Sequence, residues 1–177
     1  MQLLAILLIV QIAGPPRESE DVYRTVLADA RCSGRGTPVS RGSIPVIHRE
    51  LSVEPSFVTP LRGVLPTSLV DALSRARDDR PILDDSTAQR LNVITIEPTD
   101  VEALTKATDY WAAFFNKFPS ASAQVRLSPV AFDGEAREAL VYCEYSVSPI
   151  GGEGFIVHLR QTSGTWTALA WHRIWIS

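Results

Sequence analysis

The sequence predicts an α+β domain whose C-terminal part is a four-stranded antiparallel meander packed against helices. Two observations support this fold class. Several segments before residue 118 carry apolar residues at helical spacing, and from Gln124 onward the apolar residues recur with period two. The chain has 177 residues and is 45% hydrophobic, so it is long enough and apolar enough to bury a single core.

The N-terminal segment from Leu3 to Ala13 is almost wholly apolar. It is too short to span a bilayer, which needs about 20 residues, and it has the length of a signal-peptide hydrophobic segment. No Lys or Arg precedes it, so a buried first strand or helix is the alternative. We expect residues 1–14 to be a signal peptide, residues 17–177 to form a single domain, and the protein to be periplasmic or secreted.

The first half of the domain carries helix and strand signals in turn. Four apolar residues, Tyr23, Val26, Leu27 and Ala30, share one side of a helical segment. We therefore expect the following elements: a helix over residues 19–31, a strand within residues 44–53, a helix from Thr67 or Ser68 that stops before Pro81, and a short strand within residues 91–98.

A long amphipathic helix is predicted from Thr99 to Phe118. Thr99 and Glu102 are spaced as a capping box, in which each side chain satisfies an orphan amide of the first turn. Pro119 ends the helix. An apolar stripe follows the cap and must be buried; it consists of Leu104, Trp111, Phe114, Phe115 and Phe118.

Four strands are predicted after this helix. They cover residues 125–132 with an irregularity at Ser128-Pro129, and residues 138–147, 155–161 and 165–176. Ser163 and Gly164 fit a two-residue hairpin turn between the last two strands. The last strand is apolar on both faces, so we expect it to be central in the sheet or to lie beneath the helix that carries Trp111 and Phe115. We expect one core between helix and sheet, made of Trp111, Phe115, Trp166 and Trp175.

The glycine run in "SPIGGEGF" is the only segment that looks like a ligand motif. Gly151, Gly152 and Gly154 have strands on both sides and no helix after them, so neither a dinucleotide fingerprint nor a P-loop fits. We expect these glycines to provide positive φ in a turn, or a bulge. The alternative is a backbone nest that binds a small anion.

The sequence lacks the residue patterns that nucleic-acid binding, catalysis and metal binding require. With 17 Lys and Arg against 20 Asp and Glu, the chain has no basic excess for nucleic-acid binding. No catalytic or cofactor motif is present. On an unbroken hairpin register His158 and His172 point to opposite faces, and His48 stands alone, so no metal site is predicted. We expect a solvated face to hold the carboxylates Asp133, Glu138, Glu144 and Glu153.

The two cysteines leave two alternatives open. Cys32 and Cys143 could form a disulfide that closes a loop of about 110 residues and contributes roughly 4–5 kcal/mol. Alternatively, Cys143 is a buried free thiol and Cys32 lies on the surface. The sequence contains no information on the distance between them.

The C-terminal part carries a specific pattern of aromatic, proline and glycine residues. It consists of Trp111, Phe114, Phe118-Pro119, Ser128, Val130, Phe132, residues 139–142, residues 151–154, Gly164, Trp166 and residues 175–177. In this pattern the segment resembles a family of uncharacterised exported bacterial proteins. Members often have cysteines on both sides of the glycine turn, where this chain has Ser148 and Gly151 or their neighbours. The resemblance implies export but no activity.

Two functions are therefore expected. The first is a non-catalytic envelope domain that binds a protein partner or a small ligand, without a cofactor and without a stable membrane span in the mature chain. The second is a small enzyme with a cleft between sheet and helices, as in the cone-shaped nuclear-transport-factor-like folds. The sequence identifies neither the ligand nor the oligomeric state.

Overall fold

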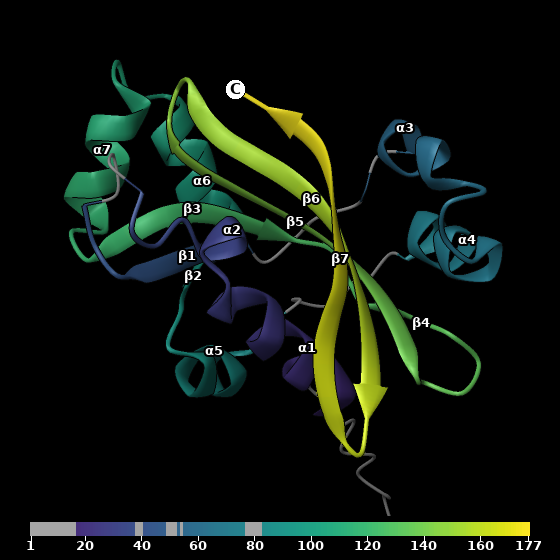
Figure 1. Ribbon diagram of the computed structural model, residues 1–177. Helices are drawn as coiled ribbons and strands as arrows, with labels where there is room; N and C mark the ends of the chain where they lie inside the picture. The colour runs from purple at the N-terminus through teal and green to yellow at the C-terminus, as the bar shows by residue number, and fades with distance from the viewer. Residues whose placement is uncertain (1–16, 38–40, 49–52, 54, 77–82) are drawn as a thin grey trace, which may run out of the picture.

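The computed structural model describes residues 17–177, apart from residues 38–40, 49–52, 54 and 77–82 (Figure 1). The signal-peptide prediction therefore lies outside the described residues. The helices are α1 (Arg17–Ala28), α2 (Ala30–Ser33), α3 (Pro55–Val58), the 3-10 turn η1 (Thr59–Leu61), α4 (Thr67–Arg75), α5 (Asp85–Leu91), α6 (Pro98–Thr105) and α7 (Tyr110–Lys117). The strands are β1 (Ile44–His48), β2 (Ile94–Ile96), β3 (Ala121–Leu127), β4 (Ala131–Phe132), β5 (Glu138–Ser148), β6 (Gly151–Thr162) and β7 (Thr165–Ile176).

The fold is α+β, but its sheet is larger than the predicted four-stranded meander. Seven strands form one mixed sheet in the order β2-β1-β3-β5-β6-β7, with β4 paired to β5. Strand β1 runs parallel to β2 and β3, whereas β3, β5, β6 and β7 are antiparallel neighbours. The predicted strands 44–53 and 91–98 therefore join the meander to extend a single sheet. Sequence spacing alone does not reveal this parallel pairing.

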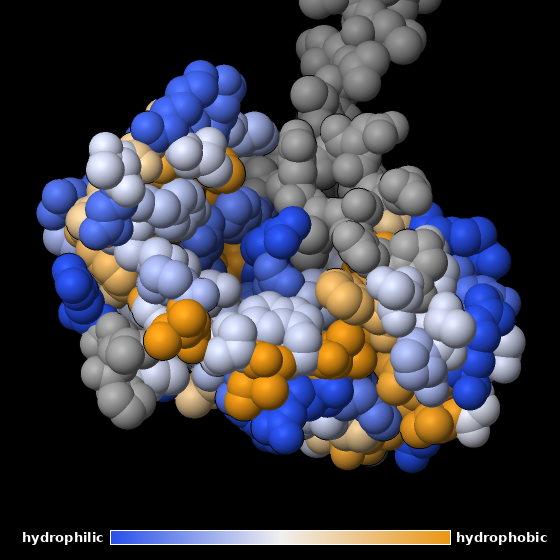
Figure 2. All heavy atoms as spheres, turned by 90° about the horizontal axis from the view of Figure 1, so that it is seen from above, coloured by the Kyte–Doolittle hydropathy of each residue, from blue (hydrophilic) through white to orange (hydrophobic). Residues whose placement is uncertain are grey.

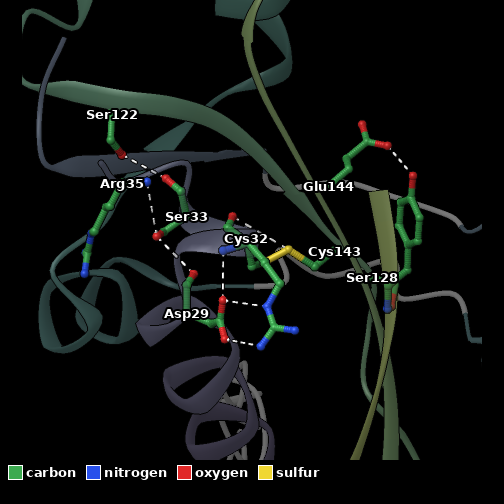
Figure 3. Close-up of a disulfide and its surroundings, with 10 residues drawn as sticks. Asp29, Cys32, Ser33, Arg35, Ser122, Ser128, Cys143 and Glu144 are labelled. Atoms are coloured by element: carbon green, nitrogen blue, oxygen red, sulfur yellow. Dashed lines mark hydrogen bonds and ion pairs between the residues drawn. A yellow bond between two sulfur atoms is a disulfide. The ribbon is translucent and has the colours of Figure 1, made fainter. Parts of the chain in front are cut away.

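One face of the sheet is closed by α1, α2 and α5 over a continuous apolar cluster. Val22, Val26 and Leu27 of α1 are buried in it as the helical pattern predicts, whereas Ala30 is exposed. A disulfide between Cys32 of α2 and Cys143 of β5 fastens this face, with the two Cα atoms 5.9 Å apart (Figure 3). The alternative that the sequence left open is thereby decided in favour of the disulfide.

The opposite face is divided between two helical blocks at its two ends (Figure 1). Helices α3 and α4 bury one apolar cluster against Leu140, Tyr142 and Ile156. Helices α6 and α7 bury a second cluster against Val46, Ile96 and Ala121. The sheet between the two blocks carries polar side chains, and these form the candidate site described below.

The predicted helix 99–118 is two helices. Pro98 occupies the first turn of α6, whose N-cap is Glu97, so the predicted capping box of Thr99 and Glu102 does not form. Asp109 then starts α7, because its carboxylate accepts a hydrogen bond from the Ala112 amide at 2.9 Å. Helix α5 was not predicted from the sequence. Helix α4 begins at Thr67, after Pro66, without a side-chain cap.

The predicted common core of four aromatic residues is wrong. Phe115 and Trp111 pack in the α6–α7 cluster, and Trp166 is buried on the closed face. Trp175 lies on the divided face, where it contacts Tyr142. Trp166 and Trp175 are nine positions apart on β7, and the two irregularities of the β6–β7 ladder between them cancel in parity, so the two indoles point to opposite faces of the sheet. No helix in the described parts of the chain has the length and apolar character needed to cross a membrane.

Candidate functional site

The strip of sheet between the two helical blocks presents polar side chains from three adjacent strands. The register places Gln124 opposite Ser146 and Arg126 opposite Glu144, and His48 extends the row on β1. These five residues form the floor of a pocket of about 340 Å³, with Val101 of α6 and Trp111 of α7 as its wall. Seen from above, the surface is hollowed between two raised parts and hydrophilic residues lie around the hollow (Figure 2).

Gln124 connects the sheet to helix α7. Its side-chain amide donates a hydrogen bond to the Tyr110 hydroxyl at 2.6 Å and lies against Nε2 of His48. Burial raises the pKa of Tyr110. Within the described part of the chain, no donor is bonded to the Gln124 amide oxygen, which therefore is free to accept a hydrogen bond from a ligand.

The imidazole of His48 is uncharged at neutral pH. Burial, and secondly the positive charge of Arg126, lower its pKa to about 4. With the Gln124 amide donating to Nε2, the ring proton resides on Nδ1. His48 therefore offers a ligand its Nδ1–H donor without a charge, while its acceptor Nε2 is bonded to Gln124. The prediction that His48 stands alone is wrong, because β1 pairs with β3, 76 residues further along the chain.

Glu144 is held by partners on both of its oxygens. Arg126 donates to Oε1 at 3.0 Å, and the Tyr142 hydroxyl donates to Oε2. The indole of Trp175 donates in turn to the Tyr142 hydroxyl at 2.8 Å. Burial, followed by the neighbouring carboxylate of Glu144, raises the pKa of Tyr142, so this hydroxyl stays protonated. Glu144 is only 9% exposed, which corrects its predicted place on a solvated face.

The three glycines of the predicted turn lie in strand β6, and the turn itself is Pro149-Ile150. None of Gly151, Gly152 and Gly154 has positive φ, so the turn prediction is wrong, whereas register shifts opposite Gly151 and Gly152 and beside Gly154 agree with the bulge that was the other expectation. Gly154 lies between Glu144 and Trp175, and a Cβ atom there would stand 2.1 Å from the indole nitrogen. The missing side chain therefore lets Trp175 cross the strand and reach Tyr142. Anion binding at these glycines stays a prediction.

His158 and His172 lie outside the pocket but on the same face of the sheet. The shifted register pairs them with Ala170 and Ile156, which corrects the prediction of opposite faces. His158 contacts the Glu138 carboxylate at 3.1 Å, and Arg160 also donates to that carboxylate. No group of three or more His, Cys, Asp or Glu side chains in the described ranges is arranged to hold a metal ion.

The other predicted carboxylates have structural roles. Asp133 accepts hydrogen bonds from the backbone amides of Arg137 and Glu138 and so shapes the turn before β5. Glu153 lies 3.8 Å from Arg173 across the β6–β7 hairpin. Neither residue lines the pocket.

No protein-family model, no curated protein and no solved structure matches this chain. The resemblance of its C-terminal part to exported bacterial proteins therefore stays a prediction. Chemical inferences about the site come from its own residues.

Proposed function

We propose that this protein is a non-catalytic binding domain of an exported bacterial protein, and that its pocket binds one hydroxyl-rich ring such as a sugar unit. The observation that carries the proposal is the combination of an aromatic wall and mixed hydrogen-bonding groups in one open pocket. Trp111 provides the wall, and His48, Gln124, Arg126 and Ser146 provide the hydrogen-bonding groups. The Cys32–Cys143 disulfide is compatible with an oxidising compartment.

The free hydrogen-bonding capacity of the floor matches hydroxyl groups. Gln124 has an unused acceptor oxygen, whereas Arg126 has N–H groups beyond the one bonded to Glu144. The Ser146 hydroxyl makes no side-chain hydrogen bond to any described residue. A ring with several hydroxyls supplies a donor and an acceptor at each of them, and its apolar face can pack on an indole. A site of this kind orients the ligand through few polar contacts.

The charge state of His48 also supports binding without catalysis. General bases work best when their pKa lies near the working pH. An imidazole whose pKa is about 4 is a weak proton acceptor at neutral pH, and it is not in the imidazolium form that acts as a general acid. A neutral His48 is therefore suited to hydrogen bonding with an uncharged ligand.

Titration with glucose, galactose, mannose and N-acetylglucosamine, followed by tryptophan fluorescence and calorimetry, tests the proposal. We expect saturable binding of at least one of them. Gln124→Ala removes a ligand contact and should weaken that binding about tenfold, as loss of one hydrogen bond does. Gln89→Ala is the matched control, because Gln89 is an exposed residue of α5 on the closed face. Absence of saturable binding to all four sugars would overturn the proposal.

An acid–base enzyme is the second candidate, because the pocket contains an imidazole and a carboxylate. Arg126 and Tyr142 fix the Glu144 carboxylate in one orientation, as a catalytic carboxylate requires. Incubation with nitrophenyl glycosides separates the two candidates. Turnover that is abolished by Glu144→Gln, with the fold intact, would replace the binding proposal with an enzymatic one.

A further inference from the structure

A second pocket is also lined by Trp111. It has a volume of about 440 Å³ and is lined by residues of α7, by the end of β5 and by Arg41. Ser148 and Pro149 form the part contributed by β5 and its turn. Trp111 lines both pockets, so the two pockets adjoin the same indole, and together they are called the groove.

The groove follows strand β5 past helix α7. Glu144 and Ser146 of β5 line the first pocket, and Val147 and Ser148 line the second, beyond a register shift in the β5–β6 ladder. At about 3.3 Å per residue, the distance from Glu144 to Ser148 is about 13 Å. This length exceeds a single sugar ring and fits a short oligomer.

The second pocket contains one cationic side chain, Arg41. The Arg41 guanidinium lies 4.9 Å from the centre of the Phe115 ring, and it makes no ion pair with any described residue. The Asp109 carboxylate, which lines the same pocket, caps α7 through Oδ1 by accepting from the Ala112 amide. Arg41 itself is exposed. A guanidinium with unused N–H groups binds a carboxylate through two parallel hydrogen bonds.

We infer that the groove binds an acidic oligosaccharide, with a ring stacked on Trp111 in the first pocket and the carboxylate of the next sugar on Arg41 in the second. This inference rests on the proposed function and specifies its ligand class. The neutral first pocket sets where the chain of sugars begins, and Arg41 selects a uronic acid as the following unit.

A matched pair of disaccharides tests the inference. Digalacturonic acid and galactobiose share the α-1,4 linkage and differ in their carboxylates. We expect digalacturonic acid to bind at least tenfold more tightly than galactobiose, because a charge-assisted bidentate contact is stronger than a neutral one. Raising the salt concentration from 0.05 to 0.5 M should reduce this advantage and leave galactobiose binding unchanged.

The variant Arg41→Gln should abolish the preference for digalacturonic acid and leave galactobiose binding intact, whereas Arg41→Lys should retain part of it. Arg75→Gln removes the same charge from an exposed site on α4 and serves as the control. Equal affinity for the two disaccharides, or a preference that survives Arg41→Gln, overturns the inference and leaves the proposed function standing. If one of the four test sugars binds but neither disaccharide does, the inference is also overturned and the proposed function still stands. If no sugar binds at all, the proposed function itself is overturned.

Discussion

The two faces of the sheet differ in how they are covered. On the face of α1, α2 and α5, one apolar cluster continues across the strands, and the Cys32–Cys143 disulfide fastens a helix to the central strand β5. On the other face, two separate clusters leave a polar strip between them. Cys143 and Glu144 are neighbours on β5, yet their side chains belong to opposite faces (Figure 3).

Because of this difference, the residues that stabilise the sheet lie on one face and the residues proposed to bind a ligand lie on the other. Alternation along β3 and β5 places Val125 and Cys143 in the closed core and Gln124 and Glu144 in the pocket. The closed face can therefore support the strands rigidly while the divided face exposes hydrogen-bonding groups to a ligand. Variants of the two faces should accordingly change different measurements.

The largest expected effect comes from the disulfide on the closed face. The double variant Cys32→Ser/Cys143→Ser opens a covalent loop with a sequence separation of 111 and should lower the free energy of unfolding by about 4–5 kcal/mol. Both positions are fully buried, so the two hydroxyls add to this cost. Denaturant unfolding of the wild type with and without reductant measures the effect. Reductant should leave the double variant unchanged, and an unshifted wild-type midpoint would contradict the proposed role of the bridge.

Removal of an aromatic ring should lower stability most in the core of the divided face and should lower binding most in the wall of the pocket. Phe114 is fully buried among the rings of Tyr110, Phe115 and Phe118, so Phe114→Ala should cost about 3–5 kcal/mol. Trp111 is only half-buried, and Trp111→Ala should cost about 1–2 kcal/mol while it weakens sugar binding more than tenfold. Unfolding midpoints and calorimetric titrations of the two variants test this contrast. Equal losses of stability would show that Trp111 belongs to the core.

The fold class and the hairpins of the C-terminal part could be predicted because their signals are local. Period-two alternation and the turn at Ser163-Gly164 lie within adjacent segments, and the structure confirms the Thr162–Thr165 pair. The helix break at Asp109 was missed, because an aromatic stripe at helical spacing continues across it. The register shifts beside Gly154 and His158 depend on packing between strands, which the spacing of residues does not reveal.

The candidate site was missed because its members are distant in sequence. His48 and Gln124 meet only through the parallel β1–β3 pairing. One signal was present in the segment "AQVRL": Gln124 and Arg126 alternate with apolar residues, so they mark a polar face on a strand whose other face is core. Glu144 gave a similar signal between Cys143 and Tyr145. These positions indicate a polar face, but only the strand order brings them into one pocket.

The lowered pKa of His48 makes the stability of the folded protein depend on pH. The pKa of His48 is about 4 in the folded protein and 6.5 in the unfolded chain, so the unfolded state binds more protons between these values. Stability is therefore complete above pH 6.5 and falls as the pH drops towards 4, by up to about 3 kcal/mol. His48→Gln should remove this part of the pH dependence, whereas His158→Gln should retain it. Unfolding measurements at pH 7.5 and pH 4.5 test the difference.

The smallest of these effects concerns Gly154, whose missing side chain leaves room for the Trp175 indole. An added Cβ would stand 2.1 Å from the indole nitrogen, so Gly154→Ala must displace Trp175 and break its bond to Tyr142. Overpacking of this kind costs about 1–3 kcal/mol. Gly134→Ala is the matched control, because an added Cβ there meets no atom within 4 Å.

A double-mutant cycle separates the clash from a general intolerance of alanine at position 154. In the background Trp175→Ala the obstructing ring is gone, so Gly154→Ala should cost about 0.5 kcal/mol or less. The carboxylate of Glu144 should also lose its fixed orientation when Trp175 no longer holds Tyr142, and sugar binding should weaken in Gly154→Ala but not in Gly134→Ala. If the cost of Gly154→Ala is the same with and without the ring, then backbone conformation, and not space for Trp175, requires glycine at this position.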